Sequence, residues 1–160
     1  MKLVQFISIV VYSFIAVSYL APWLKKLDRA EALTWLMGIH VFRYVVLYLP
    51  VARLEGYPIS NTSAMQIMTG DLSGAAIALV AITLLRFRIR LGIAFAWLLA
   101  AATIADTINI LHQRSIEPPR PDATGVWWLV FVFFAPLIMV STVLIVWQLY
   151  TRRSEPLEIQ

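Results

Sequence analysis

The sequence predicts an all-α fold, namely a polytopic membrane bundle of five transmembrane helices. Of its 160 residues, 61% are hydrophobic and only 14% are charged, whereas a typical soluble domain is about half apolar. The apolar residues gather in five runs of about 20 residues, the length that crosses a hydrocarbon core of ~30 Å. Lys and Arg gather in the segments between these runs, as they do in the loops of membrane proteins.

The five runs take up most of the chain, at residues 3–22, 32–51, 67–85, 92–111 and 126–150. The connections leave no room for a soluble domain, and neither a repeat nor a strand-like alternation is present. We therefore expect residues 1–160 to form a single integral membrane domain, multi-pass in the cell membrane.

The first run, Leu3 to Pro22, follows Lys2 and so resembles a signal peptide. It is longer than the apolar region of a usual signal peptide, and Tyr19 to Pro22 lack the small residues of a cleavage site. We expect a retained first helix.

The basic residues predict the orientation of the bundle. Eight of them fall on one side of the five spans, and four fall on the other. The eight are Lys25, Lys26, Arg29, Arg86, Arg88, Arg90, Arg152 and Arg153, and the four are Lys2, Arg53, Arg114 and Arg120. Because cytoplasmic loops carry the excess of Lys and Arg, we expect the N-terminus outside and the C-terminus in the cytoplasm. Residues 52–66 and 113–125 then form two outer loops.

The second run carries His40 and Arg43 near its midpoint. A charge in mid-membrane costs roughly 2.5 kcal/mol or more unless it is paired, so another span must supply a partner. At helical spacing His40 and Arg43 share a face, and Tyr44 extends that face.

The third and fourth runs supply acids. A helix rise of 1.5 Å per residue brings Asp71 and Asp106 to a similar depth, with Asn109 further outward. We therefore expect both carboxylates to face Arg43 in the outer half of the bundle. Two structural alternatives remain open: Asp71 caps the start of the third helix, or the Arg43 and Asp106 pair only fixes helix register.

Two further features concern helix packing. Gly70, Gly74 and Ala78 form a small-residue face that we interpret as a packing surface without chemistry. Pro136 lies near the middle of the fifth run, where it should kink the helix and accompany a cavity.

Several kinds of site are excluded or disfavoured. The absence of cysteine excludes disulfides and thiolate chemistry. His40 and His112 lie more than ~10 Å apart in depth, so they would not ligate one haem, and no metal-ligand spacing is recognisable. We expect no cofactor and no metal. Nucleic acid is not an expected partner, because the basic residues lie in short loops.

Three segments resemble an uncharacterised family of small bacterial five-helix membrane proteins. They are residues 40–44 (HVFRY), 70–72 (GDL) and 106–109 (DTIN). The likeness runs over most of the chain, but that family brings no established activity.

More remotely, the chain resembles the EXPERA group, which includes emopamil-binding sterol isomerase and sigma-2 receptor proteins. The shared features are Trp35, Gly38 and His40, the pair Ala105 and Asp106, and an aromatic fifth helix that ends in a basic tail. This resemblance implies five helices around a lipid-binding cavity, with His40 and Asp106 as cavity residues. Its isomerases carry an acid one turn after the histidine, where this chain has Arg43 and Tyr44, so catalysis does not carry over.

The leading hypothesis is a membrane-embedded binding protein for a membrane lipid or a small amphipathic ligand, held in an outer-half polar cavity. Its candidate ligand-binding residues are His40, Arg43, Tyr44, Asp71, Asp106 and Asn109. One alternative is an accessory subunit of a larger membrane complex. Another is an EXPERA-like isomerase with His40 and Asp106 as catalytic candidates, so whether the chain is an enzyme stays open. Transport is weaker, because the inner half offers few polar side chains.

Overall fold

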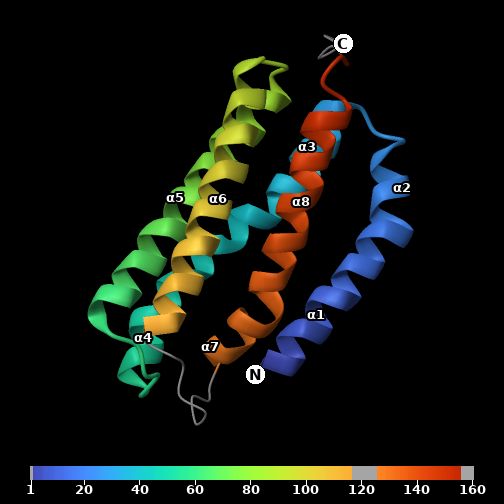
Figure 1. Ribbon diagram of the computed structural model, residues 1–160. Coiled ribbons are helices and arrows are strands. Elements are labelled where there is room, and N and C mark those ends of the chain that lie inside the picture. Colours follow the sequence, from blue (N-terminus) through green and yellow to red (C-terminus); the bar gives the residue numbers. More distant parts are fainter. Residues whose placement is uncertain (1, 117–125, 156–160) are drawn as a thin grey trace.

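The computed structural model describes residues 2–116 and 126–155, and within these ranges the protein is all-α (Figure 1). Five helices in this part of the chain are long and apolar enough to cross a membrane. They are Leu3–Leu24, Arg29–Leu54, Asn61–Arg86, Leu91–His112 and Val130–Thr151. The prediction of five apolar helices is confirmed. The chain starts and α8 finishes at opposite ends of the bundle, as an odd number of spans requires.

Three of the five spans are interrupted by a different kind of helix. The first span comprises α1 (Lys2–Ile15), the π turn η1 (Ala16–Leu20) and α2 (Ala21–Leu24). The second comprises α3 (Arg29–Val41), the 3-10 segment η2 (Phe42–Tyr48) and α4 (Leu49–Leu54). The fifth comprises α7 (Val126–Leu129), the π turn η3 (Val130–Phe134) and α8 (Ala135–Thr151). By contrast, α5 (Asn61–Arg86) and α6 (Leu91–Ile116) are uninterrupted.

Prolines explain this pattern. Pro22, Pro50 and Pro136 each lie just after one of the three irregular segments, whereas α5 and α6 contain no proline. Proline lacks an N–H, and its ring clashes with the carbonyl four residues earlier, which here lies inside η1, η2 or η3. The sequence predicted a kink at Pro136. The structure shows a π turn there, a second π turn before Pro22 and a 3-10 segment before Pro50.

The third span begins earlier than the sequence predicted. Ser60 caps α5, because its Oγ accepts a hydrogen bond of 3.1 Å from the backbone N–H of Ser63. The helix therefore starts at Asn61 instead of residue 67, and most of the outer loop predicted at 52–66 is helical. Asp71 lies more than two turns inside α5, so its interpretation as a helix cap is wrong. The second predicted outer loop, 113–125, falls largely outside the described residues.

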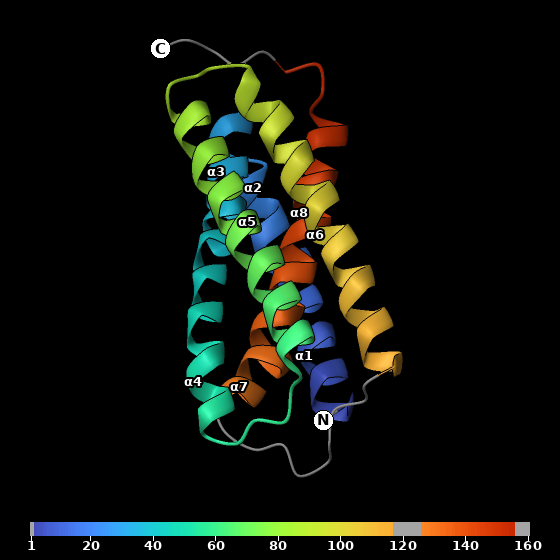
Figure 2. The same ribbon diagram turned by 90° about the vertical axis from the view of Figure 1, so that its left-hand side faces the viewer.

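The centre of the bundle is formed by α3, α5 and α6. Its buried side chains include Leu33, Leu36 and Met37 on α3, Ala78 and Ala81 on α5, and Ala96, Leu99 and Ala100 on α6. Alanines on the facing sides of α5 and α6 let these two helices lie side by side along their length, as Figures 1 and 2 show. The first span lies at the edge, where α1 packs against α8.

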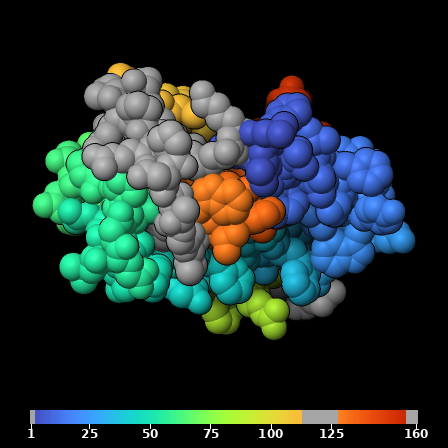
Figure 3. Space-filling model, turned by 90° about the horizontal axis from the view of Figure 1, so that it is seen from below, coloured from blue at the N-terminus to red at the C-terminus, as the bar shows by residue number. Residues whose placement is uncertain are grey.

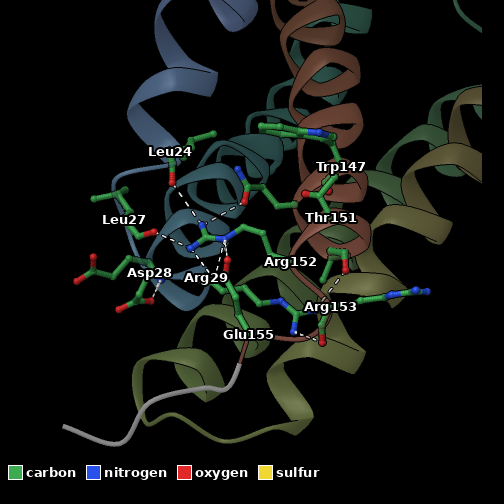
Figure 4. Close-up of polar contacts among 12 residues, drawn as sticks. Leu24, Leu27, Asp28, Arg29, Trp147, Thr151, Arg152, Arg153 and Glu155 are labelled. Carbon is green, nitrogen blue, oxygen red and sulfur yellow. Dashed lines mark hydrogen bonds and ion pairs between the residues drawn. The ribbon is translucent and has the colours of Figure 1, made fainter.

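The predicted basic side forms one end of the bundle, where α2, α5 and α8 finish. Arg152 reaches the carbonyls at the end of the first span, with 2.8 Å from Nη2 to the Leu27 oxygen (Figure 4). Arg29 donates from Nη2 to the Leu149 carbonyl near the end of α8, at 3.4 Å. These guanidinium groups satisfy carbonyls that the ends of helices leave without partners. Figure 3 views the opposite end, where α1 and the start of the fifth span lie side by side.

Candidate functional site

Arg43 is buried at the centre of three helices. It lies in η2 with 2% of its surface exposed, and it donates to both predicted acids. Nε lies 2.7 Å from Asp71 Oδ1 on α5, and Nη2 lies 2.5 Å from Asp106 Oδ2 on α6. Nη1 lies 3.1 Å from Thr103 Oγ1, also on α6. The predicted meeting of one guanidinium with two carboxylates is therefore present, and it joins the second, third and fourth spans.

Two glycines on α5 make room for these groups. A Cβ built on Gly74 would overlap Arg43 Nη1 and lie 2.8 Å from its Cζ. A Cβ built on Gly70 would overlap Asp106 Oδ1 and lie 2.9 Å from its Cγ. Gly70 and Gly74 therefore do form a packing surface, as the sequence predicted, and the groups that pack against it are the charged side chains of Asp106 and Arg43.

The cluster contains more acid than base. Arginine keeps its charge in any protein environment, so Arg43 balances one of the two carboxylates when both are ionised. Among the described residues, no second Lys or Arg forms an ion pair with Asp71 or Asp106. Asp71 also keeps its second oxygen, Oδ2, without a hydrogen-bond donor in this part of the chain. When both acids are ionised, the unbalanced negative charge lies in apolar surroundings and favours a donor or a cation.

A cavity of about 300 Å³ adjoins the cluster. Its polar end is formed by Arg43, Asp71 and Asp106, with Thr103 and Thr107 on the same helix as Asp106. Its walls are mainly apolar and include Phe131 and Phe134 of η3, together with Ile110, Leu111, Ile138 and Met139. The first span contributes Gln5 and Ile9. The cavity is therefore amphipathic, with its charges gathered at one place.

A groove on the outside of the bundle adjoins this cavity. The groove has a volume of about 330 Å³ and runs between α6 and α8, lined by Ile104, Ile108, Val143 and Val146 among others. Thr103, Thr107 and Met139 line both the groove and the cavity. These shared residues therefore lie between the groove and the cavity.

The structure places His40, Tyr44 and Asn109 away from the cavity lining. His40 is fully buried on α3, and neither ring nitrogen has a hydrogen-bond partner among the described residues. Tyr44 is 53% exposed and lies beside Phe42, with 6.2 Å between their ring centroids. Asn109 is exposed on α6. Of the six predicted ligand-binding residues, Arg43, Asp71 and Asp106 meet at the cavity.

The 3-10 segment explains why Tyr44 points outward. From His40 onward, the buried residues of this span are His40, Arg43, Val46, Leu49 and Ala52, at intervals of three. That interval is the period of a 3-10 helix, whereas the sequence prediction used the α-helical spacing of three to four. The prediction that Tyr44 shares the face of His40 and Arg43 is therefore wrong.

Sequence reasoning missed the contributions of the first and fifth spans. Gln5 is a polar residue within an apolar run, and this signal could have marked it. Phe131 and Phe134 carry no such signal, because they are two of several aromatic residues among the apolar residues that start the fifth span. Within the described residues, no group of three or more His, Asp or Glu side chains converges as metal ligands would.

Comparison with known proteins identifies the family of this chain. Residues 1–150 match a family model described as a domain of unknown function, DUF8737, so the chain belongs to this family. No curated protein and no solved structure matches the chain. The family match covers the length over which we expected a resemblance to an uncharacterised family, and the comparisons show no link to the EXPERA group.

Proposed function

We propose that this member of the DUF8737 family is a membrane-embedded binding protein for a lipid-like or small amphipathic ligand. The observation that carries this proposal is the cavity of about 300 Å³ with Arg43, Asp71 and Asp106 at one end and apolar and aromatic walls elsewhere. Such a cavity fits a ligand with one polar group and a short apolar body. The polar group would lie at the cluster, and the body would lie against Phe131 and Phe134.

In this proposal the five spans cross the cell membrane, with the N-terminus outside and the C-terminus in the cytoplasm. The eight basic residues gathered at the end where α8 finishes support this orientation. Arg43 and Asp71 lie less than one helical turn from the middle of their spans, and Asp106 lies just over one turn from the middle of its span, all displaced toward the opposite end. The cavity then belongs to the outer half of the bundle.

The groove between α6 and α8 supports access from the bilayer. It faces the surroundings of the bundle, its lining is apolar, and it shares Thr103, Thr107 and Met139 with the cavity. A ligand dissolved in the membrane would pass between these two helices without crossing water. This route suits a lipid-like molecule better than a water-soluble one.

The charges of the cluster favour a ligand whose polar group donates hydrogen bonds or is positive. Arg43 already donates to Asp71, Asp106 and Thr103, and two acids face one base. A ligand carboxylate would add a third negative group, whereas an ammonium would balance the second one. Charge-assisted hydrogen bonds contribute roughly 1.5–3 kcal/mol, enough to separate such ligands about tenfold in affinity.

The test uses three probes with the same alkyl chain: decylamine, decanol and decanoate. We expect purified protein in detergent to bind decylamine most tightly and decanoate least, as measured by native mass spectrometry. Asp71→Asn should lower the affinity for decylamine at least about tenfold, because a charge-assisted hydrogen bond is lost. Asp28→Asn, the same change at the far end of the bundle, is the matched control and should bind as wild type does.

Two results would refute the proposal. One is the absence of saturable binding for all three probes. The other is an equal effect of Asp71→Asn and Asp28→Asn, which would show that binding does not involve the cavity.

The two alternatives have less support. An isomerase would need both acid/base candidates at the substrate, and Asp106 lines the cavity whereas His40 does not. In an accessory subunit, the Arg43 cluster would only hold the helices together. That role does not account for the cavity beside the cluster. Product formation that depends on both His40 and Asp106 would favour the isomerase.

A further inference from the structure

A separate groove opens at the basic end of the bundle, between the start of α3 and the end of α5. Its volume is about 730 Å³. One wall is a face of α3 with Glu31, Thr34, Trp35 and Gly38, and the other holds Arg86 at the end of α5 and Arg88 in the following turn. It shares no lining residue with the cavity beside Arg43 and lies at the other end of the bundle.

The two walls present opposite charges that are not committed elsewhere. Glu31 and Arg86 are both exposed, and neither carboxylate nor guanidinium pairs with a described residue, including each other. Asp28 pairs with Arg88, so these two charges cancel. The groove therefore offers one anion and one cation to the same occupant, which is the complement of a zwitterion.

The wall that holds Arg88 is fixed in place. Ile89 N–H donates to the Leu84 carbonyl and Arg88 N–H donates to the Leu85 carbonyl, both at 2.9 Å, so α5 ends in a Schellman motif. Arg88 occupies the left-handed position of this motif, with φ of 57°, where glycine is usual. Its guanidinium lies 2.7 Å from Asp28, the N-cap of α3. The ion pair thus holds the end of α5 against the start of α3 and keeps the groove open.

The groove changes from polar to apolar along α3. Trp35 is 63% exposed and lies edge-on to Trp23, with 5.8 Å between ring centroids, and tryptophan is typical of the interface between lipid and water. Gly38 is one turn deeper, and a Cβ built there would meet no heavy atom within 4 Å. A head group at Glu31 and Arg86 would therefore have space for its first acyl carbons beside Trp35 and Gly38.

We propose that this groove binds a phospholipid whose head group carries a phosphate and a primary ammonium, as phosphatidylethanolamine does. Arg86 receives the phosphate, Glu31 receives the ammonium, and Trp35 contacts the start of the acyl chains. The inference rests on the bundle spanning a membrane, as in the proposed function, and it does not depend on the ligand of the cavity beside Arg43.

The test compares three phospholipids with identical acyl chains, carrying ethanolamine, choline or glycerol head groups. Native mass spectrometry of the full chain in detergent measures the dissociation constant of each. Each exposed charge contact contributes a few-fold in affinity, so we expect phosphatidylethanolamine to bind about three- to fivefold tighter than the other two. Choline offers no N–H donor, and the glycerol head group has no cation for Glu31.

Four variants test which side chain contacts which part of the lipid. Glu31→Gln should remove the preference for ethanolamine over glycerol, and Arg86→Gln should weaken all three lipids. Arg90→Gln is the matched control, because Arg90 is an exposed arginine at the same end that does not line the groove. Gly38→Leu should weaken phosphatidylethanolamine by filling the groove. The space around its Cβ lets this variant fold, which circular dichroism would verify.

Four outcomes would overturn the inference. They are equal binding of the three lipids by the wild type, a preference that survives Glu31→Gln, an effect of Arg90→Gln as large as that of Arg86→Gln, and binding of free phosphoethanolamine as tight as that of the lipid. Gly38→Leu should still bind decylamine as the wild type does. If the wild type does not bind decylamine, that result would count against the cavity proposal and would leave the inference about this groove untouched.

Discussion

Arg43 shows how much one buried side chain depends on its neighbours. Its three donor groups find Asp71, Thr103 and Asp106 on two different helices. Removing one member of a buried ion pair costs about 3–5 kcal/mol, because the remaining charge has no partner. Replacing Arg43 would leave two carboxylates facing each other, so this substitution tests folding more than binding. Asp71→Asn keeps the shape of the side chain and is the better probe of the cavity.

The glycine beside Arg43 gives the first prediction. Gly74→Ala places a methyl group where Nη1 and Cζ of Arg43 lie, and the guanidinium is held by three hydrogen bonds. We expect a loss of about 1–3 kcal/mol in the free energy of unfolding. Gly38→Ala is the matched control in open space, where the better helix propensity of alanine should stabilise by up to ~1 kcal/mol. Thermal unfolding followed by circular dichroism measures both variants, and changes of the same sign would contradict the prediction.

The second prediction concerns pH and Asp28. The hydrogen bond from Arg88 holds the pKa of Asp28 below its usual value of 3.8, against the opposing effect of burial. The ionised form therefore favours the fold, and its contribution is present above about pH 4 and is lost as the pH falls through the folded pKa. Asp28→Asn keeps an acceptor for the α3 N-cap and removes the charge. The wild type should melt at a higher temperature than this variant at neutral pH, and the difference should shrink as the pH falls below about 4. A difference independent of pH would contradict the assignment.

At the level of helices, the interval between buried residues decides which side chains of the second span face the interior. The sequence correctly predicted that the second span carries a buried arginine. It wrongly placed Tyr44 on the same face as Arg43, because the prediction used the α-helical period. In η2 the buried positions recur every three residues, so Val46 and Leu49 are buried, whereas Tyr44 and Leu47 are exposed. Pro50, eight residues after Phe42, was the available signal for an interrupted helix, but it does not specify whether the interruption is a 3-10 segment or a π turn.

The third prediction uses the prolines as a matched pair. Pro136→Ala restores an N–H to the fifth span, so the π turn η3 can become regular α-helix. A π turn holds one more residue than an α turn, so its loss would rotate Phe131 and Phe134 away from the cavity. We expect decylamine binding to fall at least about tenfold, the equivalent of one lost anchoring contact of ~1.4 kcal/mol. Pro22→Ala removes the equivalent proline after η1. None of the η1 residues lines the cavity and the first span contributes only Gln5 and Ile9 to it, so decylamine binding should fall less than in Pro136→Ala. Equal effects of the two changes would contradict this role for η3.

At the scale of the whole molecule, composition and length were enough to predict five apolar helices and one basic end. Depth, counted from helix rise, also brought Asp71 and Asp106 to Arg43. The start of α5 was missed because residues 61–66 (NTSAMQ) are mostly polar or small, and a helix that extends beyond the apolar run leaves no hydropathy signal. The apolar walls of the cavity were beyond sequence reasoning, because they come largely from the first and fifth spans, whose side chains look alike.

The fourth prediction concerns orientation, and the absence of cysteine makes it simple to test. Glu55→Cys places a thiol in the connection before α5, and Phe87→Cys places one in the turn before α6, where the side chain is 72% exposed. The excess of basic residues predicts that a membrane-impermeant maleimide labels Glu55→Cys in intact cells. It should label Phe87→Cys only after the membrane is permeabilised. The reverse pattern would invert the proposed orientation and place the cavity in the cytoplasmic half.

The three-helix contact of Arg43 also has a consequence for biosynthesis. Arg43 leaves the ribosome 28 residues before Asp71 and 63 residues before Asp106. If the bundle spans a membrane, as we propose, the second span would partition poorly into lipid until both acids have been synthesised, since an unpaired central arginine costs about 2.5–3.5 kcal/mol on insertion scales. We expect the second, third and fourth spans to wait at the translocon and to leave it as one unit.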